Sequence, residues 1–330
     1  MISTPAPVGG QVMPSPRFRI SRHRMLAWWG SGLACLLSVI GLVLCWLSPS
    51  IAAPLRPGLD FTGGSQIQLE RQCKQGSCSQ ITAPQIQAQL AKLQLPDADG
   101  GGKAPGLGGG IVQVLDQGHS LVLRLPALEP NQSAAVIEAM QAEVGPLNPN
   151  GTAVNTIGPT LGSQLLQGSL ISLLASFVAI ALYISLRYDA TFAFLALLCL
   201  AHDVLITCGV FAWLGMFWGV EVDSLFAVSL ITVAGYSVTD TVVVFDRIRE
   251  QKTSLGHLPL LDQVDVAVDA TLTRSLYTSL TTLLPLLGLI FFGGSSLFWF
   301  AVALTVGIAV GSWSSIGVAP TLLPLLASRR

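Results

Sequence analysis

Charged residues are scarce in this chain: Asp, Glu, Lys and Arg together make up 11% of its 330 residues. Soluble domains carry about 25% charged residues, so a single water-soluble globule is excluded. The 17 basic and 18 acidic residues nearly cancel, and no excess of positive charge indicates a nucleic-acid partner. With 51% hydrophobic residues, the composition favours a membrane protein.

Uncharged or nearly uncharged runs that are long enough to cross a bilayer recur along the chain. The first, Met25–Leu47, has no charged residue over 23 positions, and about 20 apolar residues span a bilayer as a helix. We therefore predict an α-helical polytopic membrane protein with six transmembrane helices. The predicted helices occupy residues 25–48, 165–186, 191–218, 224–245, 275–294 and 297–326, the last five within a bundle segment of residues 164–328.

The first span has an alternative interpretation. Basic residues at 17–24, an apolar run and the small residues at 50–53 are also typical of a cleavable signal peptide. The apolar region of a signal peptide has about 7–15 residues, and this run is far longer, which favours an uncleaved helix.

The distribution of Lys and Arg predicts the orientation of the helices, because cytoplasmic loops carry an excess of positive charge. If the N-terminus is cytoplasmic, 11 of the 17 basic residues lie in inner segments, and the short outer loops at 219–223 and 293–296 hold none. We therefore predict cytoplasmic N- and C-termini, with residues 1–24 as a cytoplasmic tail. The inner basic residues are Arg17, Arg19, Arg22, Arg24, Arg187, Arg247, Arg249, Lys252, Arg274, Arg329 and Arg330.

The segment 49–163, between the first and second predicted helices, is long enough to fold by itself. Its patterns give the order β-α-β-β-α-β, which predicts an α+β ferredoxin-like extracytoplasmic domain. The strand-like stretches are 65–71, 111–115, 120–125 and 152–157, and the helical ones are 82–95 and 131–144. Gly100–Gly110 is a glycine-rich excursion, and its Lys103 lacks the following Ser or Thr of a phosphate-binding loop.

Cys73 and Cys78 are the two cysteines of this outer segment, and they enclose four residues. An oxidising compartment would permit a disulfide between them, and two free thiols are the alternative. A metal site would need two more ligands, and His119 is the only histidine of the segment, so we predict no metal.

Asp240 is the clearest ionisable residue within a predicted span, where a charge costs about 2.5–3.5 kcal/mol on insertion scales. On a helix, Tyr236, Ser237 and Val244 share its face, so that face is polar enough to point into the bundle. Proton coupling is one explanation. A carboxyl that only joins helices by hydrogen bonds is the other.

Arg274, at the start of the fifth predicted span, is expected at a similar depth and is the predicted partner of Asp240. A guanidinium keeps its charge and favours an ionised carboxylate, whereas burial favours the neutral acid. A pair that separates and re-forms would act as a proton-operated switch. Arg274 could instead extend to lipid headgroups, and Arg247 is a competing partner on the face of Asp240.

His202 and Asp203 form a second polar insertion, near the middle of the third predicted span. Adjacent helical residues are about 100° apart, so at most one of them faces a given pathway. Asp203 is the better candidate for proton coupling, and His202 serves as readily as a donor in helix packing.

Five motifs identify a resemblance: GLDFTGG at 58–64, GPTLG at 158–162, AHDV at 201–204, GYSVTDTVVVFDRIRE at 235–250 and TLTRS at 271–275. With them the chain resembles the SecF proteins of the SecD/SecF protein-export family, within the resistance–nodulation–division superfamily. The run at 235–250 is highly specific. The first motif, with Gly58, Asp60, Phe61, Gly63 and Gly64, is shared with SecD-like chains.

The resemblance implies that the chain is one half of a two-half assembly, with SecD as the other half. It implies that the pair uses the proton-motive force to help the SecYEG channel export preproteins, with Asp240 and Arg274 in the proton-coupling positions. It also implies the bacterial cytoplasmic (inner) membrane, or a thylakoid membrane in a photosynthetic source, and a non-enzymatic protein without a cofactor. The glycine-rich excursion and the cysteine pair depart from the family pattern.

Two other functions compete with this one. A proton-coupled small-molecule exporter of the same superfamily usually carries both halves and two large outer domains in one chain. An intramembrane aspartic protease would use Asp203 and Asp240, but the Gly-x-Gly-Asp context of that class is missing, since Asp240 follows Ser-Val-Thr.

Overall fold

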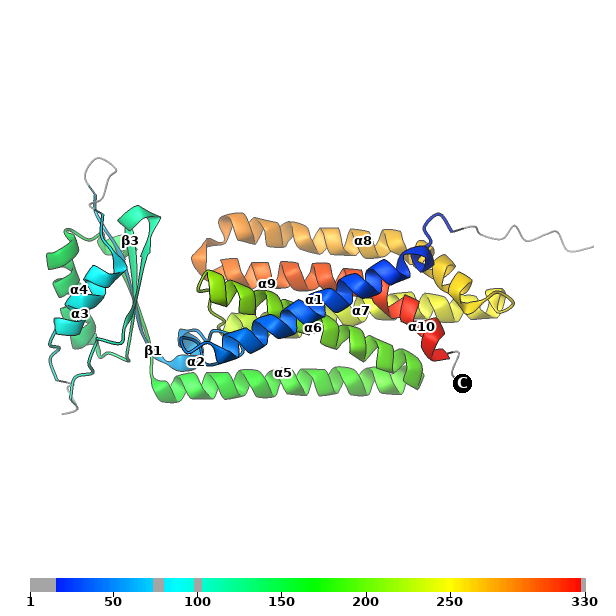
Figure 1. Cartoon of the computed structure of the whole chain (residues 1–330), viewed down its shortest axis with the longest axis horizontal. Helices are drawn as coiled ribbons and strands as arrows, with labels where there is room; N and C mark the ends of the chain where they lie inside the picture. Colours follow the sequence, from blue (N-terminus) through cyan, green and yellow to red (C-terminus); the bar gives the residue numbers. More distant parts are fainter. Residues whose placement is uncertain (1–15, 74–79, 98–102, 328–330) are drawn as a thin grey trace, which may run out of the picture. The chain divides into compact units, whose positions relative to one another are not determined.

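The computed structural model describes residues 16–73, 80–97 and 103–327 (Figure 1). They fall into two compact units. The sheet unit comprises Pro57–Ile171 together with the short segment Glu221–Ser224, and the helical unit comprises the other described residues.

The sheet unit contains one antiparallel sheet with the strand order β2-β3-β1-β4. This order, with a helix after β1 and another after β3, confirms the predicted ferredoxin-like fold. The strands are β1 (Gly64–Glu70), β2 (Ile111–Leu115), β3 (Ser120–Leu125) and β4 (Ala153–Ile157). The helical elements are α2 (Leu59–Thr62), α3 (Ala83–Lys92) and α4 (Pro130–Val144), with 3₁₀ turns η3 (Asp116–Gly118) and η4 (Pro149–Gly151).

The core of the sheet unit lies on one face of the sheet, which α3 and α4 cover (Figure 1). Alternation places Ile67 and Leu69 of β1 on this face, and Leu123 and Leu121 of β3 lie opposite them. A capping box precedes both helices: Thr82 with Gln85 at α3, and Glu129 with Gln132 at α4. In each, the side chain of one residue accepts from the backbone N–H of the other. The core residues are Ile67, Leu69, Ile86, Leu90, Leu107, Leu121, Leu123, Leu125, Leu128, Val136, Met140 and Val144.

The described residues of the helical unit include six helices that are long and apolar enough to cross a membrane, with α9, η5 and α10 forming one continuous span. This confirms the predicted polytopic helical fold. The elements are η1 (Ile20–His23), α1 (Arg24–Leu47), α5 (Pro159–Arg187), α6 (Ala190–Phe217), α7 (Ser224–Leu255), α8 (Leu260–Phe292), α9 (Gly294–Trp313), the π-helical turn η5 (Ser314–Val318) and α10 (Ala319–Ala327). Residues 159–171 of α5 and the first residue of α7, Ser224, belong to the sheet unit.

Two helices run further than the apolar runs predict. α7 continues to Leu255 and α8 begins at Leu260, because charged residues interrupt the apolar run without breaking the helix. In these extensions Ile248 of α7 and Val264 and Val268 of α8 stay buried in the shared core. Asp265 of α8 is buried too, and its carboxylate accepts hydrogen bonds from the amide and the hydroxyl of Ser21. Asp240 and Arg274 consequently lie near the middle of their helices.

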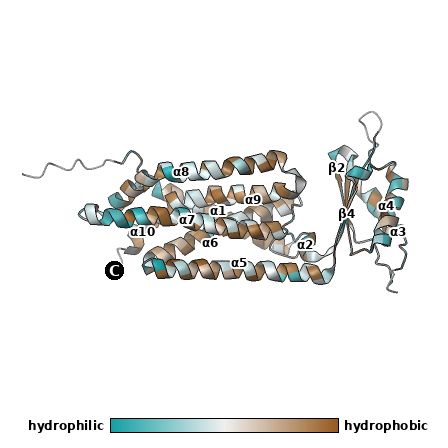
Figure 2. Cartoon of the chain, turned by 180° about the vertical axis from the view of Figure 1, so that it is seen from behind, coloured by the Kyte–Doolittle hydropathy of each residue, from teal (hydrophilic) through white to brown (hydrophobic). Residues whose placement is uncertain are grey.

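The helical unit is apolar on its surface and partly polar inside. Most of α5 and α8 is coloured as hydrophobic or neutral, and hydrophilic residues gather on α3, α4 and the C-terminal end of α7 (Figure 2). Leu174 of α5 and Phe292 of α8 are among the exposed large side chains. Asp203, Asp240 and a set of serines are buried instead. Ionisable residues inside a membrane bundle mark functional sites, so the candidate site lies in the interior of this bundle.

Candidate functional site

Asp240 of α7 is buried, with 7% of its surface exposed, and both oxygens of its carboxylate accept hydrogen bonds from serines. Ser275 of α8 donates to Oδ1 over 2.8 Å, and Ser315 of η5 donates to Oδ2. Three elements therefore converge on this carboxylate: α7, α8 and η5.

Asp203 of α6 is fully buried, and its carboxylate binds groups from three elements. The imidazole of His202 lies with Nδ1 2.7 Å from Oδ1. Ser314 of η5 donates to Oδ2 over 2.8 Å, and Ser237 of α7 donates to the same oxygen. Ser237 was expected beside Asp240 on the face of α7, and the structure shows that it binds Asp203.

The turn η5 brings two neighbouring serines to two different carboxylates. A π-helical turn has one residue more than an α-helical turn, so it shifts the direction of the side chains that follow. Ser314 thereby reaches Asp203 and Ser315 reaches Asp240. Our sequence analysis missed both serines, although two adjacent hydroxyl residues in an apolar span are a signal for helix contacts.

A second group of hydroxyls lies beside these carboxylates. Tyr236 of α7 donates to Ser279 of α8 over 3.0 Å, and Ser279 in turn lies within hydrogen-bond distance of Ser312 of α9. Tyr236 therefore contacts α8 and α9 through hydroxyl groups.

The predicted ion pair between Asp240 and Arg274 is not formed in this structure. Arg274 is exposed on α8, and its neighbour Ser275 points inward to Asp240 in its place. Arg247, the competing partner, pairs with Glu250 at 3.0 Å on the surface. Asp240 and Arg274 both lie near the middle of their helices, but the rotation of α8 about its axis turns Ser275 rather than Arg274 towards the carboxylate.

This arrangement suits a carboxyl group that changes its protonation state. A hydroxyl can donate to an ionised carboxylate, and it can accept from a neutral carboxylic acid. The serines around Asp203 and Asp240 can therefore keep hydrogen bonds in both states. Among the residues that the structure describes, no group of three or more His, Cys, Asp or Glu side chains could hold a metal ion.

The motif Gly58–Gly64 holds the segment before α7. The amide of Gly58 donates to the carbonyl of Val222 over 2.8 Å. Asp60 accepts hydrogen bonds from the amide of Ser224, at 3.1 Å, and from its hydroxyl. Since Ser224 is the first residue of α7, Asp60 satisfies a helix N-terminus whose amides lack partners within the helix.

The same motif also contacts the start of α5. Gly63 has a φ of +68° and Gly64 a φ of +124°, values that side chains disfavour, and a Cβ on Gly63 would lie 2.9 Å from the Cα of Pro159. A Cβ on Gly162 would lie 3.3 Å from the carbonyl oxygen of Phe61. Two motifs that are far apart in the sequence thus pack against each other through glycine.

The predicted disulfide is described only in part. Cys73 is disulfide-bonded, and its predicted partner Cys78 lies outside the described residues. Cys35, Cys45, Cys199 and Cys208 are free thiols within the membrane helices.

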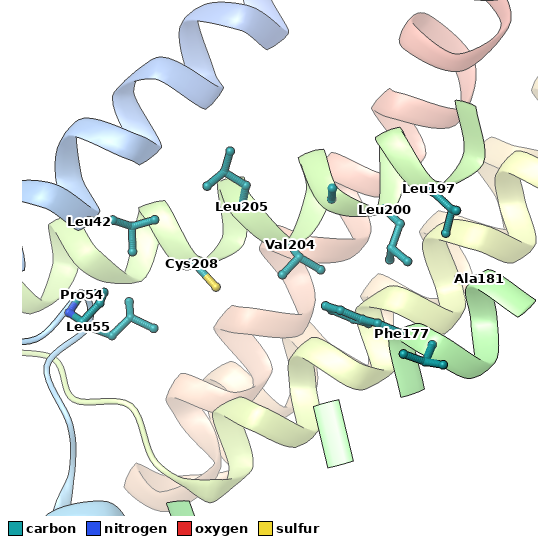
Figure 3. A pocket seen from close by; sticks show the side chains of 12 residues that line it. Leu42, Pro54, Leu55, Phe177, Ala181, Leu197, Leu200, Val204, Leu205 and Cys208 are labelled. Carbon is teal, nitrogen blue, oxygen red and sulfur yellow. The ribbon is translucent and has the colours of Figure 1, made fainter. Parts of the chain in front are cut away.

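A cavity of about 640 Å³ lies between α1, α5 and α6, on the side shown in Figure 3. Leu42 of α1, Phe177 of α5 and Val204 of α6 line it, and the thiol of Cys208 is the most polar side chain at its wall. A cavity with these walls has no charged or hydrogen-bonding side chain that would orient a polar small molecule.

Comparisons with known proteins agree with the motifs. The family model of the C-terminal region of SecD/SecF protein-export membrane proteins matches residues 136–329, and the SecD/SecF GG motif matches residues 50–74. The protein translocase subunit SecF of Prochlorococcus marinus is 52% identical over 93% of this chain and 95% of its own length. SecF of Synechocystis is 40% identical over 90% of each chain.

A longer relative carries the name SecDF. The protein translocase subunit SecDF of Thermus thermophilus is 34% identical over 82% of this chain and 34% of its own length. The crystal structure of SecDF from this organism, described as a translocon-associated membrane protein, superposes with a TM-score of 0.76 at 28% identity. It covers 97% of this chain and 40% of the SecDF chain. With the matched family models, the close SecF relatives and the shared fold, the chain belongs to the SecF family of protein translocase subunits.

Proposed function

We propose that this protein couples proton movement across the membrane to preprotein export. It works as one half of an assembly with a SecD-like chain, beside the SecYEG channel. In this proposal Asp240 is the group that takes up and releases the proton, and Asp203 supports it.

One observation carries the proposal: two carboxylates are buried among membrane helices, and hydroxyls from other helices hold them. A permanent charge at this position would be costly, and a purely structural joint would not need two acids. Because their partners are on α7, α8 and η5, a change of protonation alters contacts that join several helices. Such a change biases the packing of the bundle.

The surface of α8 supports a partner chain. Arg274, Thr278 and Thr281 are exposed and lie on one face, at positions i, i+4 and i+7. A charged side chain that faces lipid on a membrane helix is costly, which favours another polypeptide that covers this face of α8. The exposed face of α5, with Leu170, Leu174 and Val178, is apolar and suits lipid. The existence of SecDF chains is consistent with a SecD-like partner at α8.

We further propose that both termini are cytoplasmic, because the short outer loops lack Lys and Arg. The membrane is the bacterial cytoplasmic membrane, or a thylakoid membrane in a photosynthetic cell. Two of the relatives come from cyanobacteria, which supports the thylakoid membrane as the second location.

The test is preprotein translocation into inverted membrane vesicles, measured with and without a proton gradient. Asp240→Asn preserves size and hydrogen bonding but cannot exchange a proton. We expect it to insert and to bind its partner normally, and to lose the gradient-dependent increment. Asp246→Asn, an exposed acid of the same helix, is the matched control and should keep the increment.

If Asp240→Asn keeps the gradient-dependent increment, Asp240 only joins helices and the proton-coupling proposal is wrong. The partner is tested separately by co-purification of a tagged chain in mild detergent. A fully active monomer without a SecD-like chain would count against the two-half assembly. Arg274→Met should weaken this co-purification more than Arg247→Met does, because Arg247 already pairs with Glu250.

A further inference from the structure

A second cavity, separate from the cavity of Figure 3, lies beside His202, and most of its lining is apolar. It has a volume of about 360 Å³ and lies between α1, α6 and the segment from η5 to α10. Its polar side chains come from α1 and α6: Ser31, Cys35 and His202. The remaining lining residues are Trp28, Gly32, Leu198, Ala201, Leu205, Val318 and Leu322.

The imidazole of His202 has one nitrogen engaged and one without a partner. Nδ1 lies 2.7 Å from Asp203, the side chain is 9% exposed, and Nε2 is buried without a hydrogen-bond partner among the described residues. Buried polar atoms in proteins are almost always hydrogen-bonded, so Nε2 requires a polar partner in the cavity that it lines. The cavity has ample room for water, and the hydroxyl of Ser31 offers a second polar contact.

The other side of Asp203 leads towards Asp240. Ser314 donates to the second oxygen of Asp203, and the next residue, Ser315, donates to Asp240. The two acids are therefore held by neighbouring residues of one turn. The continuous run of side-chain hydrogen bonds that reaches the cavity is Ser314, Asp203 and His202.

We propose that His202 is the proton-release group of this protein and that the cavity beside it is the water-filled exit. The imidazole takes up the proton at Nδ1 from the carboxyl of Asp203 and delivers it to water from Nε2. Each step moves one proton between oxygen or nitrogen bases and changes no other bond. This inference rests on the proposed function, and it adds the route by which the proton leaves.

The place of the cavity sets the side on which the proton emerges. Trp28, Ser31 and Cys35 belong to the first half of α1, and Leu322 lies near the C-terminal end of the chain. The cavity is therefore in the half of the bundle that is nearer both termini. With cytoplasmic termini, this is the cytoplasmic half, which is where an inward proton flow must end.

The test is chemical rescue in inverted vesicles, whose outer surface is the cytoplasmic one. We expect His202→Ala to insert, to bind its partner and to lose most of the gradient-dependent increment. Added imidazole, which is no larger than the side chain removed, should restore part of the increment. His257→Ala, an exposed histidine between α7 and α8, is the matched control and should change nothing with or without imidazole.

The outcomes separate this inference from the proposed function. If Asp240→Asn loses the increment while His202→Ala keeps it, proton coupling stands and the exit through His202 is wrong. A loss in His202→Ala that imidazole does not reduce assigns His202 to helix packing and also overturns the exit. If His202→Ala fails to assemble, His202→Gln decides: it keeps a donor towards Asp203 but carries no proton, and a retained increment refutes the exit.

The serines are tested in the same assay. Ser314→Ala combined with Ser315→Ala should lose most of the increment, because Asp203 and Asp240 each lose a hydroxyl that holds the carboxylate. Ser312→Ala is the matched control: its hydroxyl binds Ser279 and the carbonyl of Ile308 rather than a carboxylate, so the increment should persist. An unchanged increment in the double variant would show that Asp203 does not depend on the hydroxyls of η5 for proton transfer, which would overturn their part in the exit.

Discussion

Arg71 in the sheet unit and Asp240 in the helical unit are both charged residues with 7% of their surface exposed, yet their partners differ in kind. The guanidinium of Arg71 donates to two backbone carbonyls, that of Val144 through Nε at 2.9 Å and that of Gly118 at 2.8 Å. The carboxylate of Asp240 accepts from two serine hydroxyls.

The difference between these partners separates a structural site from a switchable one. A carbonyl can only accept, so the carbonyls around Arg71 need a permanent donor, and arginine supplies one at any working pH. Burial lowers the pKa of the Arg71 guanidinium from its ordinary value without making it a group that titrates in the working range. A serine hydroxyl both donates and accepts, so the site of Asp240 tolerates either protonation state.

The largest effect on stability should come from Arg71→Met. Two buried carbonyls then lose a charged donor, and we expect the sheet unit to lose about 2–4 kcal/mol. Pulse proteolysis of membranes in increasing urea measures this loss. Lys92→Met, at an exposed position, is the control. If Arg71→Met is as stable as the parent, the carbonyls do not depend on the guanidinium and the comparison fails.

A smaller effect is expected at Asp60, whose carboxylate accepts from the amide and the hydroxyl of Ser224. The amide can only donate, so this part of the site cannot reverse its role. Asp60→Ala removes the cap of α7, which is worth about 1 kcal/mol. The amides of the first turn of α7 should exchange with deuterium about fivefold faster, because 1 kcal/mol corresponds to that factor. Asp60→Asn keeps an acceptor and should show less. Equal exchange in Asp60→Ala and the parent would remove Asp60 from the capping role.

Asp203→Asn should cost still less stability, although it replaces a buried acid. An amide retains a carbonyl acceptor for the serines, and hydrogen bonds between membrane helices are worth about 0.6 kcal/mol on average. Thermal unfolding in mild detergent should therefore change little, while the gradient-dependent increment of export should be lost. A destabilisation as large as that of Arg71→Met would place Asp203 among the structural sites.

The smallest effect is expected at Tyr188, between α5 and α6, and only in alkaline solution. Burial, with a further contribution from the Asp246 carboxylate, raises the pKa of Tyr188 to about 12. The unfolded chain loses this proton near its ordinary value of 10.0, so the contribution of Tyr188 to stability is constant below pH 10 and falls as the pH rises towards 12.

The ultraviolet absorbance of the phenolate measures this titration. The step near pH 12 should be missing in Tyr188→Phe, and Asp246→Asn should move it to lower pH. A Tyr188 step at the ordinary pKa would mean that the phenol is in contact with water.

The sequence alone was enough to predict the two folds of the molecule. Apolar runs of membrane length depend only on local composition, and all six appear as helices. Residue alternation is equally local, so the strands 111–115 and 120–125 were predicted with the bounds that β2 and β3 have. The burial of Asp240 followed from the polar residues on its helix face, which is again a matter of helical period.

Only the tertiary structure decided which groups meet. Ser315 is 75 residues from Asp240, Ser314 is 111 from Asp203, and Ser224 is 164 from Asp60, so no local pattern links them. The period of a helix tells which residues share a face, but the rotation of the helix in the bundle depends on packing against its neighbours. That rotation turned Ser275 rather than Arg274 towards Asp240, and the extra residue of η5 directed two adjacent serines to two acids.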